Sequence, residues 1–218
     1  MTIRGDSYAG YRQKLVEQVR LKGVKDLSVL RAISEVPRHL FVPPALLVSA
    51  YEDTSLPIGN GQTISQPSTH ARAIEALALT GHERVLEVGT GSGYQTALLA
   101  LCASTVFTIE RVAALADGAR RALANAGITN VSFLVGDGTL GWRAYAPYDA
   151  VLVAAASPDV PAPLLEQLAP GGRLVIPIGD ARVQTLTLVT HSPDGAPRRQ
   201  SLAGATFVPL RGTHGFDA

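Results

Sequence analysis

The chain has 218 residues, of which 46% are hydrophobic and 17% charged, and its formal net charge is +1. This length and apolar content suffice for one sizeable α/β domain, and the near-neutral charge argues against nucleic-acid binding or attachment to an anionic membrane. A single cysteine, Cys102, excludes an internal disulfide, and the first 20 residues are too charged for a signal peptide. We therefore expect a cytoplasmic protein that lacks membrane-spanning segments.

The N-terminal part predicts two helices and then an irregular segment. Apolar residues recur at helical spacing from Tyr8 to Val19, and Gly23 can end that helix. Asp26 can cap a second helix, which must stop before Pro37. The stretch from Pro37 to Pro67 is rich in proline and lacks clean periodicity, yet its apolar residues argue against disorder. We expect an ordered, functional connection there.

From Arg84 onward, strands alternate with helices. This pattern predicts βαβ units, a parallel sheet and right-handed crossovers. The Gly171-Gly172 pair is expected to be a helix-to-strand turn. The predicted strands are Arg84–Val88, Thr105–Glu110, Val131–Val135, Asp149–Ala155 and Arg173–Ile178, and the predicted helices are Tyr94–Cys102, Val112–Asn125 and Ala162–Leu168.

The sequence pattern changes after Gly179, where helical patterns give way to alternating residues and turn signals. Thr185–Thr190 alternates, Ser192–Gly195 has turn composition, and Thr206–Leu210 resembles another short strand, so an antiparallel hairpin at the sheet edge is expected. Together these elements predict a single doubly wound α/β domain over residues 1–218. Within it we expect a helical and substrate-binding segment at 1–80, a cofactor-binding core at 81–180 and the hairpin at 181–218.

The loop after the first core strand carries glycines at 89, 91 and 93. Glycines allow backbone N–H groups to approach a ligand, and the N-terminus of the next helix adds partial positive charge. A dinucleotide fingerprint would need glycine or alanine at position 94, where this chain has Tyr94. The spacing is closer to the loop that holds S-adenosylmethionine, so a nicotinamide oxidoreductase is the less favoured alternative.

Two acidic residues follow the next strands. Glu110 ends the second strand, where a carboxylate can accept hydrogen bonds from ribose hydroxyls, and Asp137 lies between Gly136 and Gly138 after the third. Either could instead be a solvated strand end or a turn residue. Both positions fall at the carboxyl ends of parallel strands, where open α/β sheets bind ligands.

Further segments carry a resemblance to a known family. They are Val36–Arg38, Phe41–Pro43, Tyr51–Asp53, Leu56–Pro67, Phe107–Glu110, Gly136–Gly138, Gly141–Trp142, Ala146–Asp149, Gly171–Pro177 and Phe207–Leu210. Over nearly its whole length the chain resembles the protein-L-isoaspartate O-methyltransferases, and the Gly61–Pro67 segment is specific to them. The resemblance implies a Rossmann-like methyltransferase fold with an N-terminal helical cover and a C-terminal antiparallel hairpin.

The resemblance also implies an activity. S-adenosyl-L-methionine would donate a methyl group to the α-carboxylate of L-isoaspartyl residues in damaged proteins, leaving S-adenosyl-L-homocysteine. The methyl ester would then close to a succinimide that partly reopens as normal aspartate. The implied cofactor residues are Glu87, Gly89, Thr90, Gly91, Gly93, Glu110, Asp137, Gly138 and His70; the implied active-site residue is Ser65; and the implied substrate residues are Thr63, Ile64, Gln66 and Val208.

Ser65 has two readings. As Ser-x-Pro ahead of a helical pattern, it is a good N-cap; by resemblance, it orients the substrate and is not a nucleophile. A carboxylate substrate is already ionised at neutral pH, so no general base is needed. Ser68 and Thr69, which replace the usual less polar pair, are expected to make the mouth of the site more polar.

Other expectations are negative or competing. The five histidines are scattered without partners at metal-ligand spacing, so we expect no metal. We expect a monomer. Two rival functions stay open: an enzyme that uses the same cofactor with another acceptor acid, and a binding module that retains the cofactor without turnover.

Overall fold

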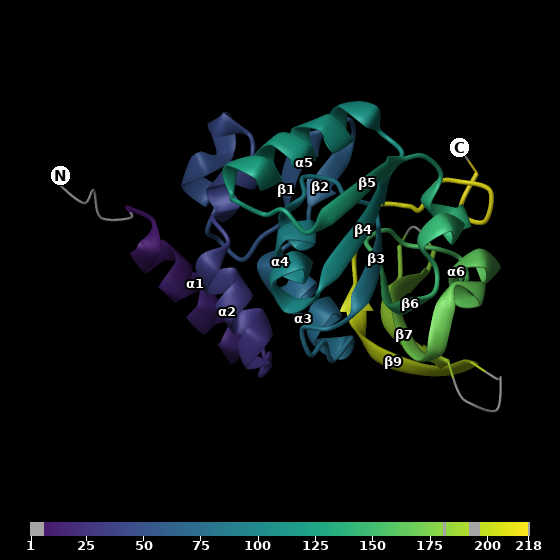
Figure 1. Cartoon of the computed structure of the whole chain (residues 1–218). Helices are drawn as coiled ribbons and strands as arrows, with labels where there is room; N and C mark the ends of the chain where they lie inside the picture. The colour runs from purple at the N-terminus through teal and green to yellow at the C-terminus, as the bar shows by residue number, and fades with distance from the viewer. Residues whose placement is uncertain (1–6, 181, 192–196, 218) are drawn as a thin grey trace.

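The computed structural model describes residues 7–180, 182–191 and 197–217. Its central feature is a twisted sheet with strand order β5-β4-β3-β6-β7-β8-β9 (Figure 1). The strands from β5 to β7 are parallel, and β8 and β9 are antiparallel additions at one edge. Their bounds are β3 Arg84–Val88, β4 Thr105–Glu110, β5 Val131–Val135, β6 Tyr148–Val153, β7 Leu168–Gly179, β8 Gln184–His191 and β9 Pro197–Ala205.

Helices cover both faces of this sheet (Figure 1). Alternate residues of each strand divide between two apolar clusters: Val85 packs with residues of α1 to α5, whereas Leu86 packs with Leu164 of α6. This period-2 division is what a sheet buried on both faces requires. The helices are α1 Ala9–Leu21, α2 Leu27–Glu35, α3 Pro67–Ala76, α4 Tyr94–Cys102, α5 Ala113–Asn125 and α6 Ala162–Glu166.

The N-terminal helices confirm their sequence signals. The Asp26 carboxylate accepts hydrogen bonds from the N–H groups of Ser28 at 2.8 Å and Val29 at 3.1 Å, which caps α2. Gly23 has φ +97° just after α1, a conformation that glycine adopts without strain. Both helices pack on the side of the sheet that α3 and α4 cover (Figure 1).

The proline-rich connection is ordered. It contains the 3₁₀ turns η1 (Arg38–Phe41) and η2 (Pro44–Ser49) and an antiparallel hairpin of β1 (Leu56–Gly59) and β2 (Gln62–Ile64). Arg38 is fully buried, and its guanidinium donates to the carbonyls of Ala50, Thr54 and Ser65. One buried cation therefore fixes the path of a segment that has little regular structure of its own.

Two predictions about the last third were wrong. Gly171 and Gly172 lie inside β7, which starts at Leu168 and bulges between its pairings with Tyr148 and Ala150. The strand that pairs with β8 is Pro197–Ala205, not Thr206–Leu210. Residues 206–210 instead lie against the loop after β6, where Pro209 forms an isolated bridge with Ala156. The predicted turn at Ser192–Gly195 falls outside the described residues.

The sheet topology positions the site. From β3 the chain moves outward through β4 to β5, and it then returns to the other side of β3 as β6. In open α/β sheets, ligands bind outside the carboxyl ends of the strands at such a reversal. The topology therefore places the residues that follow β3, β4 and β6 at the binding crevice. Among the described residues, no helix combines the length and apolarity needed to cross a bilayer.

Candidate active site

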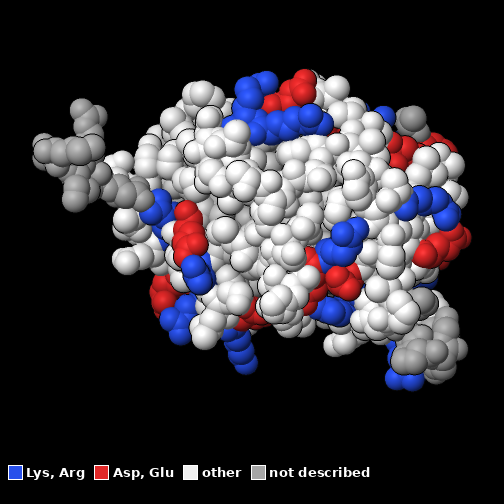
Figure 2. Space-filling view, viewed as in Figure 1, with Lys and Arg blue, Asp and Glu red and all other residues white. Residues whose placement is uncertain are grey.

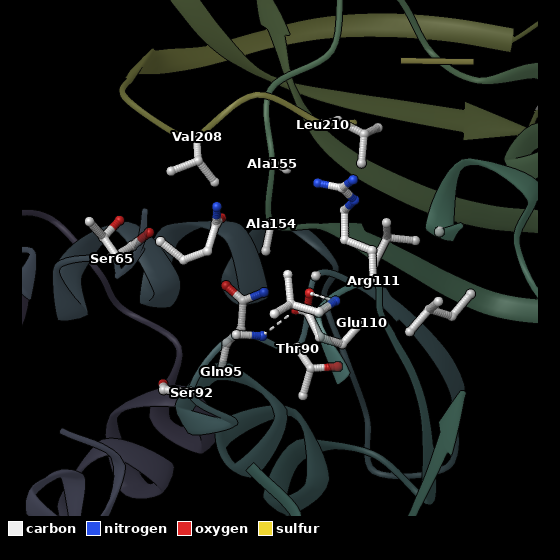
Figure 3. Close-up of a pocket in the computed structure, with 18 of the residues that line it drawn as sticks. Ser65, Thr90, Ser92, Gln95, Glu110, Arg111, Ala154, Ala155, Val208 and Leu210 are labelled. Atoms are coloured by element: carbon white, nitrogen blue, oxygen red, sulfur yellow. Dashed lines mark hydrogen bonds between the residues drawn. The ribbon is translucent and has the colours of Figure 1, made fainter. Parts of the chain in front are cut away.

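A cavity of about 820 Å³, open to solvent at its mouth, lies at this reversal (Figure 3). Ser65 and Val208 stand on one side of it and Glu110 and Arg111 on the other, with Ala154 between them. The full lining is Gln62, Thr63, Ile64, Ser65, His70, Val88, Gly89, Thr90, Gly91, Ser92, Gln95, Ile109, Glu110, Arg111, Val112, Gly138, Ala154, Ala155, Val208, Pro209, Leu210 and Arg211.

The glycine loop forms one wall, but its N–H groups are used within the protein. The N–H groups of Gly89 and Thr90 donate to the Ile109 carbonyl, that of Gly93 donates to Thr90, and that of Gly91 donates to Glu110. We expected these groups to face a ligand. The glycines serve the turn instead, with φ between +54° and +94°. Gly93 does not line the cavity: a Cβ there would lie 3.0 Å from that of Ala119 on α5.

Glu110 both supports the glycine loop and lines the cavity. One carboxylate oxygen accepts from the Gly91 N–H and the other from the Val112 N–H, both at 2.9 Å. Glu110 therefore ties the glycine loop to the start of α5. Each oxygen retains further acceptor capacity toward the cavity, because a carboxylate has about four lone-pair sites.

Of the two residues predicted in the loop after β5, only Gly138 lines the cavity. A Cβ at Gly138 would lie 2.4 Å from Cγ1 of Val88, so a larger residue would clash with β3 at this wall of the cavity. The Asp137 carboxylate is not among the lining groups. It accepts from the N–H and hydroxyl groups of Thr139 and of Thr213, which holds the C-terminal segment and lowers the pKa of Asp137 despite its partial burial. Its adenine-binding role stays a prediction.

Glu87 lies beneath the cavity and does not line it. One of its oxygens accepts from the hydroxyls of Thr96 at 2.5 Å and Thr108 at 2.7 Å, and the other accepts from the Gln95 amide at 3.2 Å. Full burial raises the pKa of Glu87 to about 7, and the three hydrogen bonds only partly offset this. Any contact of Glu87 with cofactor stays a prediction.

The structure tests one of the two interpretations of Ser65, the helix cap. The N-cap of α3 is Gln66, which makes no side-chain cap, and the acceptor for the Ser68 N–H is Asp53, at 2.7 Å. The capping interpretation of Ser65 was therefore wrong. Ser65 lines the cavity, and Arg38 fixes its backbone by donating to its carbonyl at 3.1 Å.

Two neighbours of Ser65 point elsewhere. Ser68 is fully buried and accepts a hydrogen bond from the Gln66 amide at 3.0 Å, so the prediction that it makes the mouth of the site more polar was wrong. The sequence favours an exposed Ser68 because it does not reveal the hydrogen-bond partners, Gln66 and Asp53, that this side chain and its N–H find on folding. Gln66 does not line the cavity either, and its role toward substrate stays a prediction.

His70 does reach the cavity, from the second turn of α3. It is 5% exposed, and its Nδ1 lies 2.5 Å from the Gln95 side-chain oxygen. Burial, with a smaller contribution from the positive charge of Arg38, lowers the pKa of His70 to about 4 against the opposing effect of the Gln95 hydrogen bond. The ring is therefore neutral at physiological pH.

The sequence interpretation missed several lining residues. Gln95 lies one position past the start of α4, Arg111 follows Glu110 directly, and Ala154 and Ala155 follow β6. The signal for Ala154 and Ala155 was present, because β6 ends at the same sheet edge as β3 and β4. The predicted substrate residues Thr63, Ile64 and Val208 all line the cavity.

Charges elsewhere are mixed. On the face shown in Figure 2, Lys and Arg alternate with Asp and Glu between large uncharged areas. Within the described part of the chain, no group of three His, Cys, Asp or Glu side chains is arranged to hold a metal ion.

A glycine turn after β3, an acidic residue ending β4 and a small-residue wall after β6 form the nucleoside-binding crevice of a Rossmann-like fold, and comparison with known proteins gives its class, the S-adenosylmethionine-dependent methyltransferases. The model of one family, protein-L-isoaspartate(D-aspartate) O-methyltransferase, matches residues 10–215. The chain belongs to that family.

Sequence relatives match nearly the whole chain. A protein-L-isoaspartate O-methyltransferase of Syntrophus aciditrophicus is 50% identical over 214 residues, covering 97% of this chain and 98% of the relative. Another of the same name, from Dictyoglomus thermophilum, is 51% identical over 209 residues, covering 96% and 94%.

Solved structures agree as well. A protein-L-isoaspartate O-methyltransferase structure is 31% identical with a TM-score of 0.84, covering 94% of this chain and 67% of the other. A putative family member from Plasmodium falciparum, in complex with S-adenosyl-L-homocysteine, is 25% identical with a TM-score of 0.80, covering 92% and 98%.

Proposed function

We propose that this protein transfers a methyl group from S-adenosyl-L-methionine to the α-carboxylate of L-isoaspartyl residues in damaged proteins, which starts their repair through a succinimide. The observation that carries this proposal is the cavity in which the Thr63–Ser65 segment faces the glycine loop and Glu110. Family membership supports the reaction and the cofactor.

The residues present fit this cofactor. Its ribose hydroxyls and ammonium group are hydrogen-bond donors, and the cavity offers acceptors in the Glu110 carboxylate and in Nε2 of His70, which is buried without a partner among the described residues. Arg111 and Arg211 also line the cavity and bring positive charge to it. When bound, the cofactor supplies an electrophilic methyl carbon on a sulfonium.

We assign the cofactor to the side of the cavity formed by Gly89, Thr90, Gly91, Glu110 and Gly138. Glu110 would accept from the ribose, and the bare backbone of Gly138 would leave room for the adenine. Glu87 and Gly93 would act from beneath, by supporting the loop and its packing on α5, and Asp137 by holding the segment that carries Val208 to Arg211.

The acceptor side needs orientation, not deprotonation. An isoaspartyl α-carboxylate is ionised at neutral pH, so the remaining task is to align its oxygen with the methyl carbon. The hydroxyls of Ser65 and Thr63 are suitable donors to that carboxylate. Alignment of this kind recovers roughly 7–11 kcal/mol of the barrier in well-oriented reactions.

We propose that the peptide lies extended between β2 and Val208. Backbone contacts there would explain recognition of damaged sites that share no sequence, and extended peptides bind sheet edges in this way.

We further propose that the chain is one domain that works as a 22.8 kDa monomer in the cytoplasm. Light scattering after gel filtration would test the oligomeric state, and a mass near 45 kDa, about twice that value, would overturn it.

The decisive assay uses two peptides of one sequence, one with L-isoaspartate and one with aspartate, and counts base-labile methyl esters. We expect esterification of the isoaspartyl peptide alone. If neither peptide reacts while another small acid does, the acceptor assignment is wrong. If S-adenosylhomocysteine binds but forms with no acceptor, the protein is a binding module.

A further inference from the structure

A segment that is neither helix nor strand completes one side of the cavity. Residues 207–211 follow β9, and Val208 to Arg211 line the cavity. The Ala156 N–H donates to the Val208 carbonyl at 2.8 Å, and the Leu210 N–H donates to the Ala156 carbonyl at 2.7 Å. Two backbone hydrogen bonds therefore tie the middle of the 207–211 segment to the loop after β6.

The start of this segment is held by a side chain, that of Gln184 at the beginning of β8. The Phe207 N–H donates to Oε1 of Gln184 at 2.7 Å, and Nε2 of Gln184 donates to the Phe207 carbonyl at 3.1 Å. Paired residues of two antiparallel strands exchange the same two kinds of bond. The glutamine side chain thus gives Phe207 the partners that a neighbouring strand would otherwise supply.

Gln184 is well placed to act as an anchor. Its backbone pairs with Gly179 of β7 and with Ala205 of β9, and its Nε2 also donates to the Asp180 carbonyl at 3.1 Å. The residue is 6% exposed, so water has little access to compete for these hydrogen bonds. Because the amide oxygen and both amide hydrogens are in use, the side chain is held in one orientation.

Phe207 transmits this restraint to the cavity. Its side chain is buried in the larger apolar cluster, whereas the adjacent Val208 points into the cavity (Figure 3). Since the two residues are neighbours in the chain, a backbone fixed at Phe207 limits where the Val208 side chain can lie. Gln184 itself does not line the cavity, so it acts there only through the 207–211 segment.

We propose that Gln184 is a positioning residue for the acceptor peptide: it fixes the backbone of Phe207 and so holds Val208 where the peptide contacts it. This inference rests on the proposed function, in which the peptide lies between β2 and Val208. The glycine loop and Glu110 are held by separate hydrogen bonds. Loss of the anchor should therefore weaken peptide binding and leave cofactor binding unchanged.

Gln184→Met removes the hydrogen bonds and keeps the length of the side chain. We expect the KM for an isoaspartyl peptide to rise about tenfold, while kcat and the dissociation constant of S-adenosylhomocysteine stay within about twofold of the wild type. Such a split is the signature of binding that is lost equally from the ground state and the transition state. Steady-state kinetics and calorimetry measure these constants, and an unchanged KM would overturn the proposal.

Thr187→Val is the matched control. Thr187 lies on the same strand, is also 6% exposed, and its hydroxyl donates to the Thr185 carbonyl at 3.1 Å, a bond that does not reach the 207–211 segment. We expect this variant to keep the wild-type KM even if urea unfolding shows a lower stability. An equal rise of KM in both variants would show that Gln184 has a structural role only.

A further measurement uses the wild type alone and so does not depend on the folding of a variant. Although Phe207 lies outside the strands, its N–H should exchange with deuterium as slowly as the N–H groups of β8, and rapid exchange would overturn the proposal. If the wild type esterifies no isoaspartyl peptide, the proposed function fails and this inference fails with it. If the wild type is active and Gln184→Met keeps its KM, this inference alone fails.

Discussion

At the scale of single residues, the shape of the cavity depends on a glycine, because a side chain at that position would clash with the sheet. Gly138 and Gly136 flank Asp137, yet only Gly138 is packed against β3. A Cβ at Gly138 would lie 2.4 Å from Val88, whereas one at Gly136 would lie 3.9 Å from Leu134. Substitution by alanine is therefore expected to disturb the cavity wall at Gly138 and to be tolerated at Gly136.

We expect Gly138→Ala to raise the dissociation constant of S-adenosylhomocysteine at least tenfold and to lower stability by about 1–3 kcal/mol through overpacking. Isothermal titration measures the affinity and urea unfolding the stability. Gly136→Ala is the control and should match the wild type. Equal behaviour of the two variants would show that the Gly138 wall does not contact the cofactor.

Ser65 is the second residue-scale test. Because it does not cap α3, Ser65→Ala should leave the unfolding free energy within about 0.5 kcal/mol of the wild type. Turnover should fall roughly 10- to 100-fold, since the acceptor carboxylate loses an orienting donor. Steady-state kinetics with isoaspartyl peptide, beside S-adenosylhomocysteine binding, would check this. Unchanged turnover would remove Ser65 from the active site.

At the scale of elements, α3 is held by a residue far from it in sequence. Asp53 accepts from the Ser68 N–H and also pairs with Lys22 at 2.5 Å. Asp53→Ala should destabilise the protein by about 1 kcal/mol, the usual loss for a helix cap. Lys22→Met should change it less, since the lysine is half-exposed and such pairs are weak. Denaturant midpoints of the two variants would decide, and the reverse order would contradict the cap.

The alternating core was predictable because its strands are short apolar runs separated by helical patterns. The edge was not. β9 (Pro197–Ala205) is charged and mostly exposed, as edge strands often are, so its sequence lacks the usual alternation. Thr206–Leu210 has strand-like residues but packs over the sheet edge, where Val208 to Leu210 line the cavity. Composition alone does not distinguish these two uses of β-forming residues.

The site was predicted in outline for the same reason. Gly89, Glu110 and Gly138 follow strands of a parallel sheet, so topology brings them together. The partners of Asp137 and Ser68 are Thr213 and Asp53, which lie 76 and 15 positions away, and no local sequence pattern indicates them. Long-range hydrogen bonds of this kind become visible only in the folded chain.

At the scale of the whole molecule, the buried carboxyl of Glu87 should make stability depend on pH. The folded protein keeps this group protonated up to about pH 7, while the unfolded chain releases the proton near pH 4.5. Above pH 4.5 the folded state therefore binds more protons, and stability falls as the pH rises.

Relative to Glu87→Gln, the wild type should lose on the order of 3 kcal/mol of stability between pH 4.5 and pH 7.5. Urea unfolding of both proteins across this range would measure the difference. His70, whose pKa is lowered, acts in the opposite direction below pH 6.5 but is present in both proteins. A constant difference between them would show that Glu87 titrates as an ordinary carboxyl.

The central claim is that one cavity at the carboxyl ends of β3, β4 and β6 holds the methyl donor beside the acceptor segment. A crystal structure with S-adenosylhomocysteine tests it most directly. We predict density along Gly89 to Gly91, with the ribose on Glu110 and the sulfur facing Ser65. Density in the neighbouring groove between Phe41 and α5, with the cavity empty, would contradict it.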